Sequence, residues 1–365
     1  MLRGINVTLN ANWYKRTTYS KGEGNVSWYD ISMSKKVLIT GITGQDGAYL
    51  SQLLLGKGYE IHGLVRRLST PNYWRLEELG IREKVKIVEG DITDEHSLSS
   101  LVKMIQPDEV YNLAAQSFVG TSLQQPILTT QVNTMGTLHL LNAVKLYCPK
   151  AKVYQASTSE MYGNSHINNT QDEVTPLHPR SPYAISKLAA HWLTINYRES
   201  FGMFACSGIL FNHESPLRGI EFVTRKISDG VARIKLGLQN TISLGNLDAR
   251  RDWGFAGDYV EAMWLMLQQN TPDDYVISTG ENHSVRDFLD AAFREIGITD
   301  WIPYVQADPA MIRPAELLEL CGKSDKAKKT LGWSPKVHFT ALVKMMVEAD
   351  LRHVAAEKAA KATMK

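Results

Sequence analysis

Three glycines spaced three residues apart, Gly41, Gly44 and Gly47, follow directly after the short apolar run 37–40. The apolar run predicts a buried strand, and the residues from 48 to 55 have the character of a helix. A strand, a glycine-rich turn and a helix in this order form an anion site, because glycine lets the backbone approach a phosphate and helical N–H groups point toward it. The spacing of the glycines alone is weak evidence, but the strand and the helix on either side of them predict a phosphate-binding turn.

Apolar runs and helical stretches alternate along the chain as far as residue 210. Strands are predicted at 61–65, 85–89, 109–113, 151–156 and 204–210, and helices at 128–147 and 182–200. This alternation demands a parallel sheet with helices on both faces, and such sheets bind ligands at the carboxyl ends of their strands. We therefore expect an α/β fold with a doubly wound, Rossmann-type parallel sheet.

Polar side chains follow three of these predicted strands. Arg66 and Arg67 come after the strand 61–65, where two guanidinium groups suit a 2′-phosphate and hence NADP rather than NAD. The alternative is an exposed basic turn. Asp91 follows the next strand and is placed to bond an adenine amine, and Ser117, after the strand 109–113, could reach a substrate.

The stretch from Ser157 to Lys187 carries the strongest candidates for catalysis. Thr158 and Glu160 follow a buried strand, whereas Tyr183 and Lys187 are four residues apart near the start of a helix capped by Ser181. This spacing places the two side chains on one helix face. An ammonium beside a phenol favours the phenolate, so we expect the pKa of Tyr183 to fall well below about 10. The alternative is a chance pair on a surface helix.

Composition narrows the class of protein. The chain has 365 residues, is 44% hydrophobic and carries a net charge of +2, which favours a globular protein and gives no reason to expect nucleic acid. Its three widely spaced cysteines suggest neither a disulfide framework nor a metal site, and no apolar run is long enough to span a membrane. We expect a cytoplasmic protein.

Four regions are expected along the chain. Residues 1–34 lack periodicity and are predicted to be an extension, with the natural start near Met33 and a small docked arm as the alternative. The NADP-binding domain covers 35–210. A mainly substrate-binding region covers 211–352, with some segments returning to the first domain, and 353–365 is an Ala/Lys-rich tail that frays. Arginines clustered beyond residue 211 could bind a diphosphate, although a solvated basic face is the alternative for each.

Longer segments resemble a known family. They are T-G-I-T-G-Q-D-G-A-Y-L, N-L-A-A-Q-S-F-V, Q-A-S-T-S-E-M-Y-G, P-R-S-P-Y-A-I-S-K, L-F-N-H-E-S-P-L-R-G-I-E-F-V-T-R-K and R-R-D-W-G-F-A-G-D-Y-V-E-A-M. Over about residues 36–352 the chain resembles the extended short-chain dehydrogenase/reductases that act on nucleotide sugars, in particular the NDP-sugar dehydratases. The match implies a homodimer or homotetramer. A family-like R-R-S-S turn would have Ser where Leu68 stands, which weakens the expected contact of that turn with a neighbouring subunit.

The resemblance also implies roles for individual residues. Catalytic roles are implied for Thr158, Glu160, Tyr183 and Lys187. NADP contacts are implied for Gly41, Thr43, Gly44, Gln45, Asp46, Gly47, Arg66, Asp91, Ile92, Leu113, Ala114, Ala115, Ser117, Tyr183, Lys187, His213 and Arg218. Substrate contacts are implied for Ser117, Thr158, Glu160, Asn212, Val223, Lys226, Arg251, Arg313 and Glu316. No metal is expected.

The implied activity is that of a hydro-lyase in deoxyhexose biosynthesis, with GDP-mannose as substrate and NADP regenerated in each turnover. Glu160 separates this reaction from its nearest relatives, because a 4-epimerase needs no base for the proton on carbon 5. A 4-epimerase, a 4-keto-6-deoxymannose reductase and an enzyme with both dehydratase and reductase activity remain as alternatives. A non-catalytic NADP-sensing protein is the alternative from another class.

Overall fold

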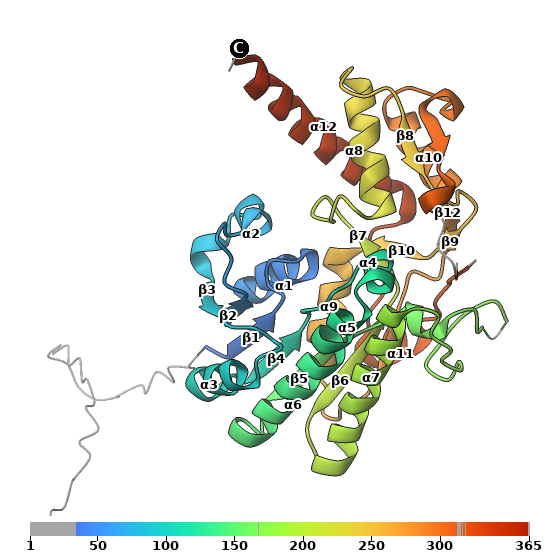
Figure 1. Ribbon diagram of the computed structural model, residues 1–365. Helices are drawn as coiled ribbons and strands as arrows, with labels where there is room; N and C mark the ends of the chain where they lie inside the picture. Colours follow the sequence, from blue (N-terminus) through green and yellow to red (C-terminus); the bar gives the residue numbers. More distant parts are fainter. Residues whose placement is uncertain (1–33, 167, 312–314, 316, 318, 364–365) are drawn as a thin grey trace, which may run out of the picture. The chain divides into compact units, whose positions relative to one another are not determined.

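The computed structural model describes residues 34–363 apart from 167, 312–314, 316 and 318. Its centre is a seven-stranded sheet in the order β11-β6-β5-β4-β1-β2-β3, in which every neighbouring pair is parallel (Figure 1). The strands are β1 (Lys36–Thr40), β2 (Glu60–Val65), β3 (Lys86–Glu89), β4 (Glu109–Asn112), β5 (Lys152–Thr158), β6 (Ala205–Leu210) and β11 (Tyr275–Ile277). The predicted doubly wound parallel sheet is confirmed.

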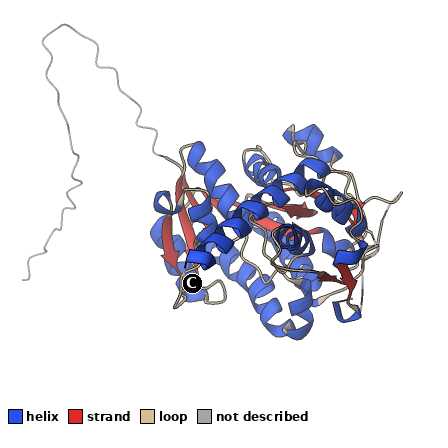
Figure 2. Cartoon of the chain, turned by 90° about the horizontal axis from the view of Figure 1, so that it is seen from above, coloured by secondary structure: helices blue, strands red, loops and turns tan. Residues whose placement is uncertain are grey.

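Helices cover both faces of this sheet (Figure 2). One face packs against α1 (Gln45–Gly56), α2 (Trp74–Glu78), α9 (Ala256–Leu267) and α11 (Asp325–Leu331). The other face packs against α3 (Glu95–Ile105), α6 (Gly136–Tyr147) and α7 (Pro182–Phe201). Alternate residues of β1 serve the two cores, since Val37 and Ile39 face the first and Leu38 the second.

The helix predicted over 128–147 is divided in the structure. After α4 (Val119–Gln124) the chain forms α5 (Pro126–Thr130), then a π-helical turn, η2 (Gln131–Met135), and only then α6. A π turn widens the helix by one residue and changes the direction of the side chains that follow. Here the turn contains Asn133, whose buried side chain bonds to two other segments of the chain.

The C-terminal region forms a smaller core of its own beside the ends of the strands. It contains α8 (Val223–Lys235), α10 (Val285–Glu295), α12 (Phe339–Thr363) and three two-stranded pairs. The pairs are β7 (Asn212–Glu214) with β10 (Trp253–Phe255), β8 (Ile242–Leu244) with β13 (Val305–Ala307), and β9 (Arg250–Arg251) with β12 (His283–Ser284). Single helical turns complete the described chain: η1 (Arg82–Lys84), η3 (Ser159–Tyr162), η4 (Ile302–Tyr304) and η5 (Pro309–Met311).

Side chains hold the start of α10 and the end of α12. Ser284 and Asp287 form a capping box at the start of α10. The expected fraying of the tail is not observed, because α12 continues to Thr363. Glu357 pairs with Arg233 of α8, and the Lys358 ammonium donates to the Leu236 carbonyl. These contacts join the last turns of α12 to α8.

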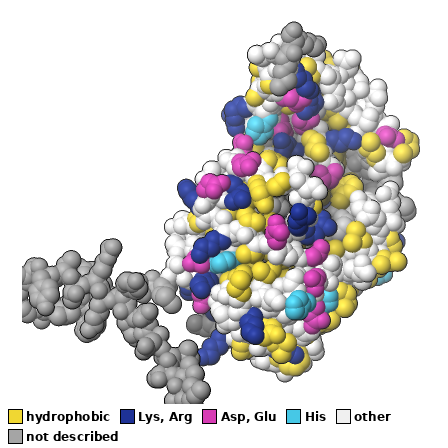
Figure 3. All heavy atoms as spheres, turned by 60° about the vertical axis from the view of Figure 1, so that its left-hand side comes forward, with side chains coloured by type: hydrophobic (Ala, Val, Ile, Leu, Met, Phe, Trp, Pro, Cys, Tyr) yellow, Lys and Arg dark blue, Asp and Glu magenta, His cyan; other side chains and the backbone are white. Residues whose placement is uncertain are grey.

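The predicted extension lies outside the described residues, apart from Ser34. On the face shown in Figure 3, basic and acidic side chains are interspersed with small apolar areas. None of the described helices is both long and apolar enough to cross a bilayer.

Candidate functional site

A deep pocket opens at the carboxyl ends of β1, β4, β5 and β6, where the chain's polar motifs meet. Of the predicted site residues it is lined by Gly41, Gly44, Gln45, Asp46, Gly47, Leu113, Ala115, Ser117, Thr158, Glu160, Tyr183, Lys187, Asn212, His213 and Arg218. These residues come from both halves of the chain, so the fold brings together segments about 170 residues apart.

The other predicted residues lie at different places. Arg66 and Asp91 line a second pocket, after β2 and β3. Thr43 and Arg66 line a third pocket. Ile92 is buried in the second core. Val223, Lys226 and Arg251 lie outside these pockets, on α8 and β9. Arg313 and Glu316 lie outside the described residues.

The glycine-rich turn shows why it needs glycine. A Cβ atom on Gly47 would lie 2.4 Å from the Gly41 carbonyl oxygen, and Gly41, at φ +70°, would place a Cβ 2.8 Å from the Ala114 nitrogen. The Thr40 hydroxyl fastens the same junction, since it accepts the N–H groups of Leu113 and Ala114. No side chain among the described residues caps the first turn of α1. Its N–H groups therefore point into a cradle that fits the diphosphate of a dinucleotide.

The four predicted catalytic side chains meet in the pocket. Thr158 ends β5 and Glu160 is the second residue of η3, and the Glu160 N–H donates to the Thr158 Oγ1 at an N···O distance of 3.3 Å. Tyr183 and Lys187 lie one turn apart on α7 and are both buried, and Tyr183 hydrogen-bonds Thr158. The helix begins as predicted, because the Ser181 hydroxyl accepts the N–H of Ala184.

Burial controls the protonation of this group. It raises the pKa of Tyr183 to about 12, with Glu160 adding to the rise and the Thr158 hydrogen bond opposing it. Burial also lowers the pKa of Lys187 to about 8, against the attraction of Asp46. The expected fall in the Tyr183 pKa is therefore wrong for the chain by itself. Desolvation of the phenolate outweighs the nearby positive charge.

A second charged pair, Asp46 and His213, lines the same pocket. The Nε2 atom of His213 lies 2.9 Å from the Asp46 Oδ2, and its Nδ1 lies 2.7 Å from the Phe211 carbonyl oxygen. Burial lowers the pKa of His213, but Asp46 more than reverses this and leaves it raised. A protonated His213 can donate to both acceptors, so it ties the start of α1 to β7.

Sequence reasoning missed Asn133. Its amide oxygen accepts the Gln116 N–H, and its amide nitrogen donates to the Gln116 carbonyl and to the Ser186 hydroxyl. Asn133 therefore holds the turn that carries Ser117 against the helix that carries Lys187. The sole local signal was a polar residue within an apolar helical stretch, which does not reveal a π turn.

Comparisons with known proteins agree with this architecture. The Thermus thermophilus UDP-glucose 4-epimerase, solved with NAD, superimposes with a TM-score of 0.75 and 28% identity, covering 86% of this chain and 98% of that one. A Thermotoga maritima UDP-glucose 4-epimerase shares the fold at a TM-score of 0.78 and 24% identity, covering 87% of this chain and 99% of that one. With the turn and the Tyr-Lys pair in place, the fold and the site are those of an extended short-chain dehydrogenase/reductase.

Sequence relatives define the family more closely. The family model for GDP-mannose 4,6 dehydratase matches residues 38–346. The chain is 54% identical to GDP-mannose 4,6 dehydratase 2 of Arabidopsis thaliana, over 89% of each protein. It is 49% identical to GDP-mannose 4,6-dehydratase of Vibrio cholerae serotype O1, over 87% of this chain and 94% of that protein. The chain belongs to the GDP-mannose 4,6-dehydratase family.

Lys187 should reduce the stability of the free protein. Its pKa is about 8 in the fold against 10.5 in an exposed lysine, so keeping it protonated at pH 7 costs the fold about 3 kcal/mol, at about 1.4 kcal/mol per unit. We expect Lys187→Met to raise Tm at pH 7 while abolishing activity. The gain should shrink as the pH rises from about 8 toward 10.5, because the wild-type lysine then loses its proton. Thermal denaturation across this pH range measures it.

The exposed Lys150 offers a matched control, since Lys150→Met removes the same charge without relieving burial. A Lys187→Met protein that melts no higher than the wild type at pH 7 would contradict the predicted cost.

Proposed function

We propose that this chain removes water from GDP-α-D-mannose to give GDP-4-dehydro-6-deoxy-D-mannose, with NADP as a cofactor that ends each turnover unchanged. The observation that carries the proposal is the position of Glu160. Its carboxylate is close enough to Tyr183 to raise the pKa of that phenol, and both line the same pocket. The pocket thus holds one candidate base for a hydroxyl and a second for a carbon-bound proton.

The residues divide the reaction between them. Tyr183 accepts the proton of the sugar 4-hydroxyl, while the Thr158 hydroxyl bonds the same oxygen and Lys187 stabilises the phenolate. When bound, the nicotinamide supplies a hydride acceptor and donor, and its oxidised ring adds a positive charge that favours the phenolate. The 4-ketone acidifies the proton on carbon 5. Glu160 then removes that proton and protonates the hydroxyl that leaves carbon 6 as water, which leaves a double bond between carbons 5 and 6. Return of the hydride to carbon 6 and of the Tyr183 proton to carbon 5 would give the 4-keto-6-deoxy product.

The main alternative is a 4-epimerase, since the Thermus thermophilus relative of similar fold has that activity. Mass spectrometry of the purified chain with NADP and GDP-mannose separates the two, because a dehydratase product is lighter by one water and an epimerase product is not. A product that retains the water would contradict the proposal. Added NADPH would reveal any reductase activity as a second, reduced product.

We propose NADP rather than NAD because Arg66 and Arg67 line the second pocket, after β2 and β3. Arg66→Asp replaces a partner of the 2′-phosphate with a like charge. We expect it to weaken NADP binding by about 10–100-fold, the worth of one charged hydrogen bond, with little effect on NAD. Titration with each cofactor measures the difference. Lys84→Asp, an exposed change of the same charge outside the second pocket, is the control, and an equal loss for both cofactors would make Arg66 structural.

The two proposed bases can be separated by substitution. Glu160→Gln keeps the size of the side chain but removes the basic carboxylate, which typically costs about 10²–10⁴-fold in the step that it serves. The variant should still bind GDP-mannose and accumulate reduced nicotinamide absorbance, without exchange of the carbon 5 proton in deuterated solvent. Tyr183→Phe should also abolish the absorbance change. Normal carbon 5 exchange in Glu160→Gln would assign the base to another residue.

We also propose a homodimer, formed through α5 and α7, which pack side by side. Ile127 on α5 is 74% exposed, and Ile185 and Trp192, two turns apart on α7, are each 56% exposed. Neighbouring exposed apolar side chains of this size are typical of interfaces. Ile185→Glu with Trp192→Glu should halve the mass measured by light scattering, whereas Leu146→Glu on α6 should not. A wild-type chain that is monomeric at all concentrations would contradict the dimer.

The proposed location is the cytoplasm. Cys148, Cys206 and Cys321 are buried, unpaired thiols. Free thiols are usual in proteins of reducing compartments.

A further inference from the structure

The segment 215–222, which we call the strap, joins β7 to α8 and forms part of the pocket wall. It places Arg218 and Phe222 in the pocket wall and buries Leu217 in the first core. The Arg218 guanidinium lies 3.6 Å from the centre of the Phe222 ring, and its Nε lies 3.0 Å from the Glu214 Oε2 without the alignment of a hydrogen bond. Arg218 is thus a pocket cation whose position follows that of the strap.

One side of the strap is fastened to the glycine-rich turn. The Ser215 hydroxyl donates to the Gln45 Oε1 at 2.7 Å. Arg75 of α2 donates from Nε to the Leu217 carbonyl at 2.7 Å and from Nη1 to the Thr43 carbonyl at 3.1 Å. These bonds set the distance between the strap and the cradle for the diphosphate.

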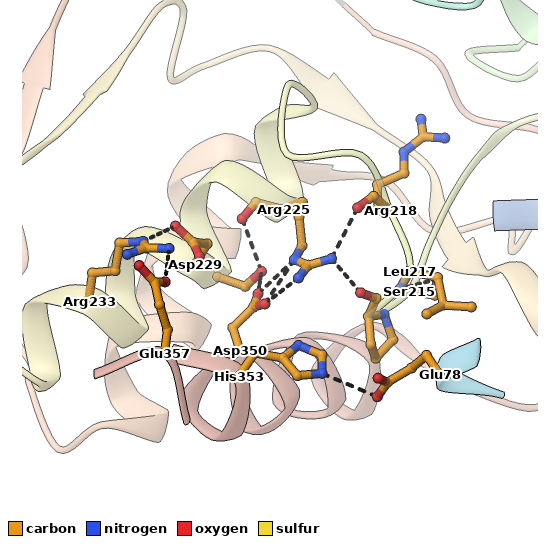
Figure 4. Close-up of polar contacts among 12 residues, drawn as sticks. Glu78, Ser215, Leu217, Arg218, Arg225, Asp229, Arg233, Asp350, His353 and Glu357 are labelled. Carbon is orange, nitrogen blue, oxygen red and sulfur yellow. Dashed lines mark hydrogen bonds and ion pairs between the residues drawn. The ribbon is translucent and has the colours of Figure 1, made fainter. Parts of the chain in front are cut away.

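The other side of the strap is held by a buried ion pair (Figure 4). Arg225 of α8 donates from Nη1 to the carbonyls of Pro216 and Arg218, and its Nε and Nη2 face the Asp350 carboxylate of α12 at 2.7–3.0 Å. The Ser228 hydroxyl donates to the second carboxylate oxygen of Asp350. Because the guanidinium is planar, the carboxylate on one edge fixes where Nη1 points.

Asp350 has no exposure to solvent, so its charge depends on this pair. Burial raises its pKa, while Arg225 and Ser228 oppose the rise. Loss of one partner in such a pair leaves the other charge buried and uncompensated. The strap would then lose the donor that holds two of its carbonyls.

A neighbouring pair shows that α8 and α12 have a second connection. Arg233 bonds Asp229 and Glu357 further along the same two helices. In the described structure neither carboxylate bonds to the strap, and Arg233 and Glu357 are 29% and 36% exposed. Both ion pairs join α8 to α12. Of the two, only the buried pair of Arg225 and Asp350 is bonded to the strap in the described structure.

We propose that Asp350 is a positioning residue for the cofactor: through Arg225 and the strap, the C-terminal helix sets the place of Arg218 in the dinucleotide pocket. The inference rests on the proposed binding of NADP and adds to it a residue that does not line the pocket. Arg218 would contribute its charge to the diphosphate in the place that the strap gives it.

The test is titration of the full chain with NADPH, followed by its fluorescence. Asp350→Asn should raise the dissociation constant by about tenfold. Arg225→Lys, which keeps a charge beside Asp350 but cannot also reach both carbonyls, should do the same and provides the test if Asp350→Asn does not fold. In an Arg218→Ala background, Asp350→Asn should cause no further loss, because the two residues act through one contact chain.

Two controls separate positioning from general destabilisation. Glu357→Gln breaks the neighbouring ion pair, and Val347→Ala opens a cavity in the buried face of α12. Val347→Ala should lower Tm, yet both should bind NADPH within about twofold of wild type. Unchanged binding by Asp350→Asn, an undiminished loss in the Arg218→Ala background, or an equal loss in Val347→Ala would overturn the proposal. A wild-type chain that binds no NADPH would instead contradict the proposed cofactor.

Discussion

The close approach of two turns is the constraint on which the site depends. The turn after β1 meets the turn after β4 at Gly41 and Ala114, where a Cβ atom on Gly41 would not fit, and the Thr40 hydroxyl closes the junction. This contact lies between the central strand β4 and its neighbour β1, where the connections diverge to opposite faces. All seven parallel strands end at the same edge of the sheet. The junction at this edge therefore also determines where η3, α7 and the strap contribute their side chains to the pocket.

The pocket contains titratable groups whose charged forms are disfavoured by burial. Lys187 and Tyr183 are both shifted toward their neutral forms, whereas Asp46 and His213 sustain each other as an ion pair. The site therefore has one pair whose charges stabilise each other and one pair whose charged forms are disfavoured by burial. Strongly perturbed titratable groups are kept chiefly where they bind or react, and the packing around them offsets the free-energy cost.

Local patterns were enough to predict much of the fold and the candidate site. Strand ends, the glycine turn and the cap at Ser181 follow from short-range chemistry, and each appears within a residue or two of its expected place. The π turn at Asn133 and the link from Asp350 to Arg225 could not be predicted, because each depends on partners distant in the sequence. The Tyr183 pKa was mispredicted because sequence shows the neighbouring charge but not the depth of burial.

The two outer strands of the sheet affect how copies of this chain can meet. β3 has only four residues and begins and ends with exposed, charged Lys86 and Glu89. β11 has three residues, and the Val276 N–H is already bonded to the Glu173 carboxylate. Edge strands with open amides recruit strands from other molecules and seed aggregates, and short, charged or covered edges prevent this. The short, charged or covered edge strands of this sheet therefore disfavour edge-to-edge pairing between molecules, even at high concentration. Copies of the chain are left to associate through their helices.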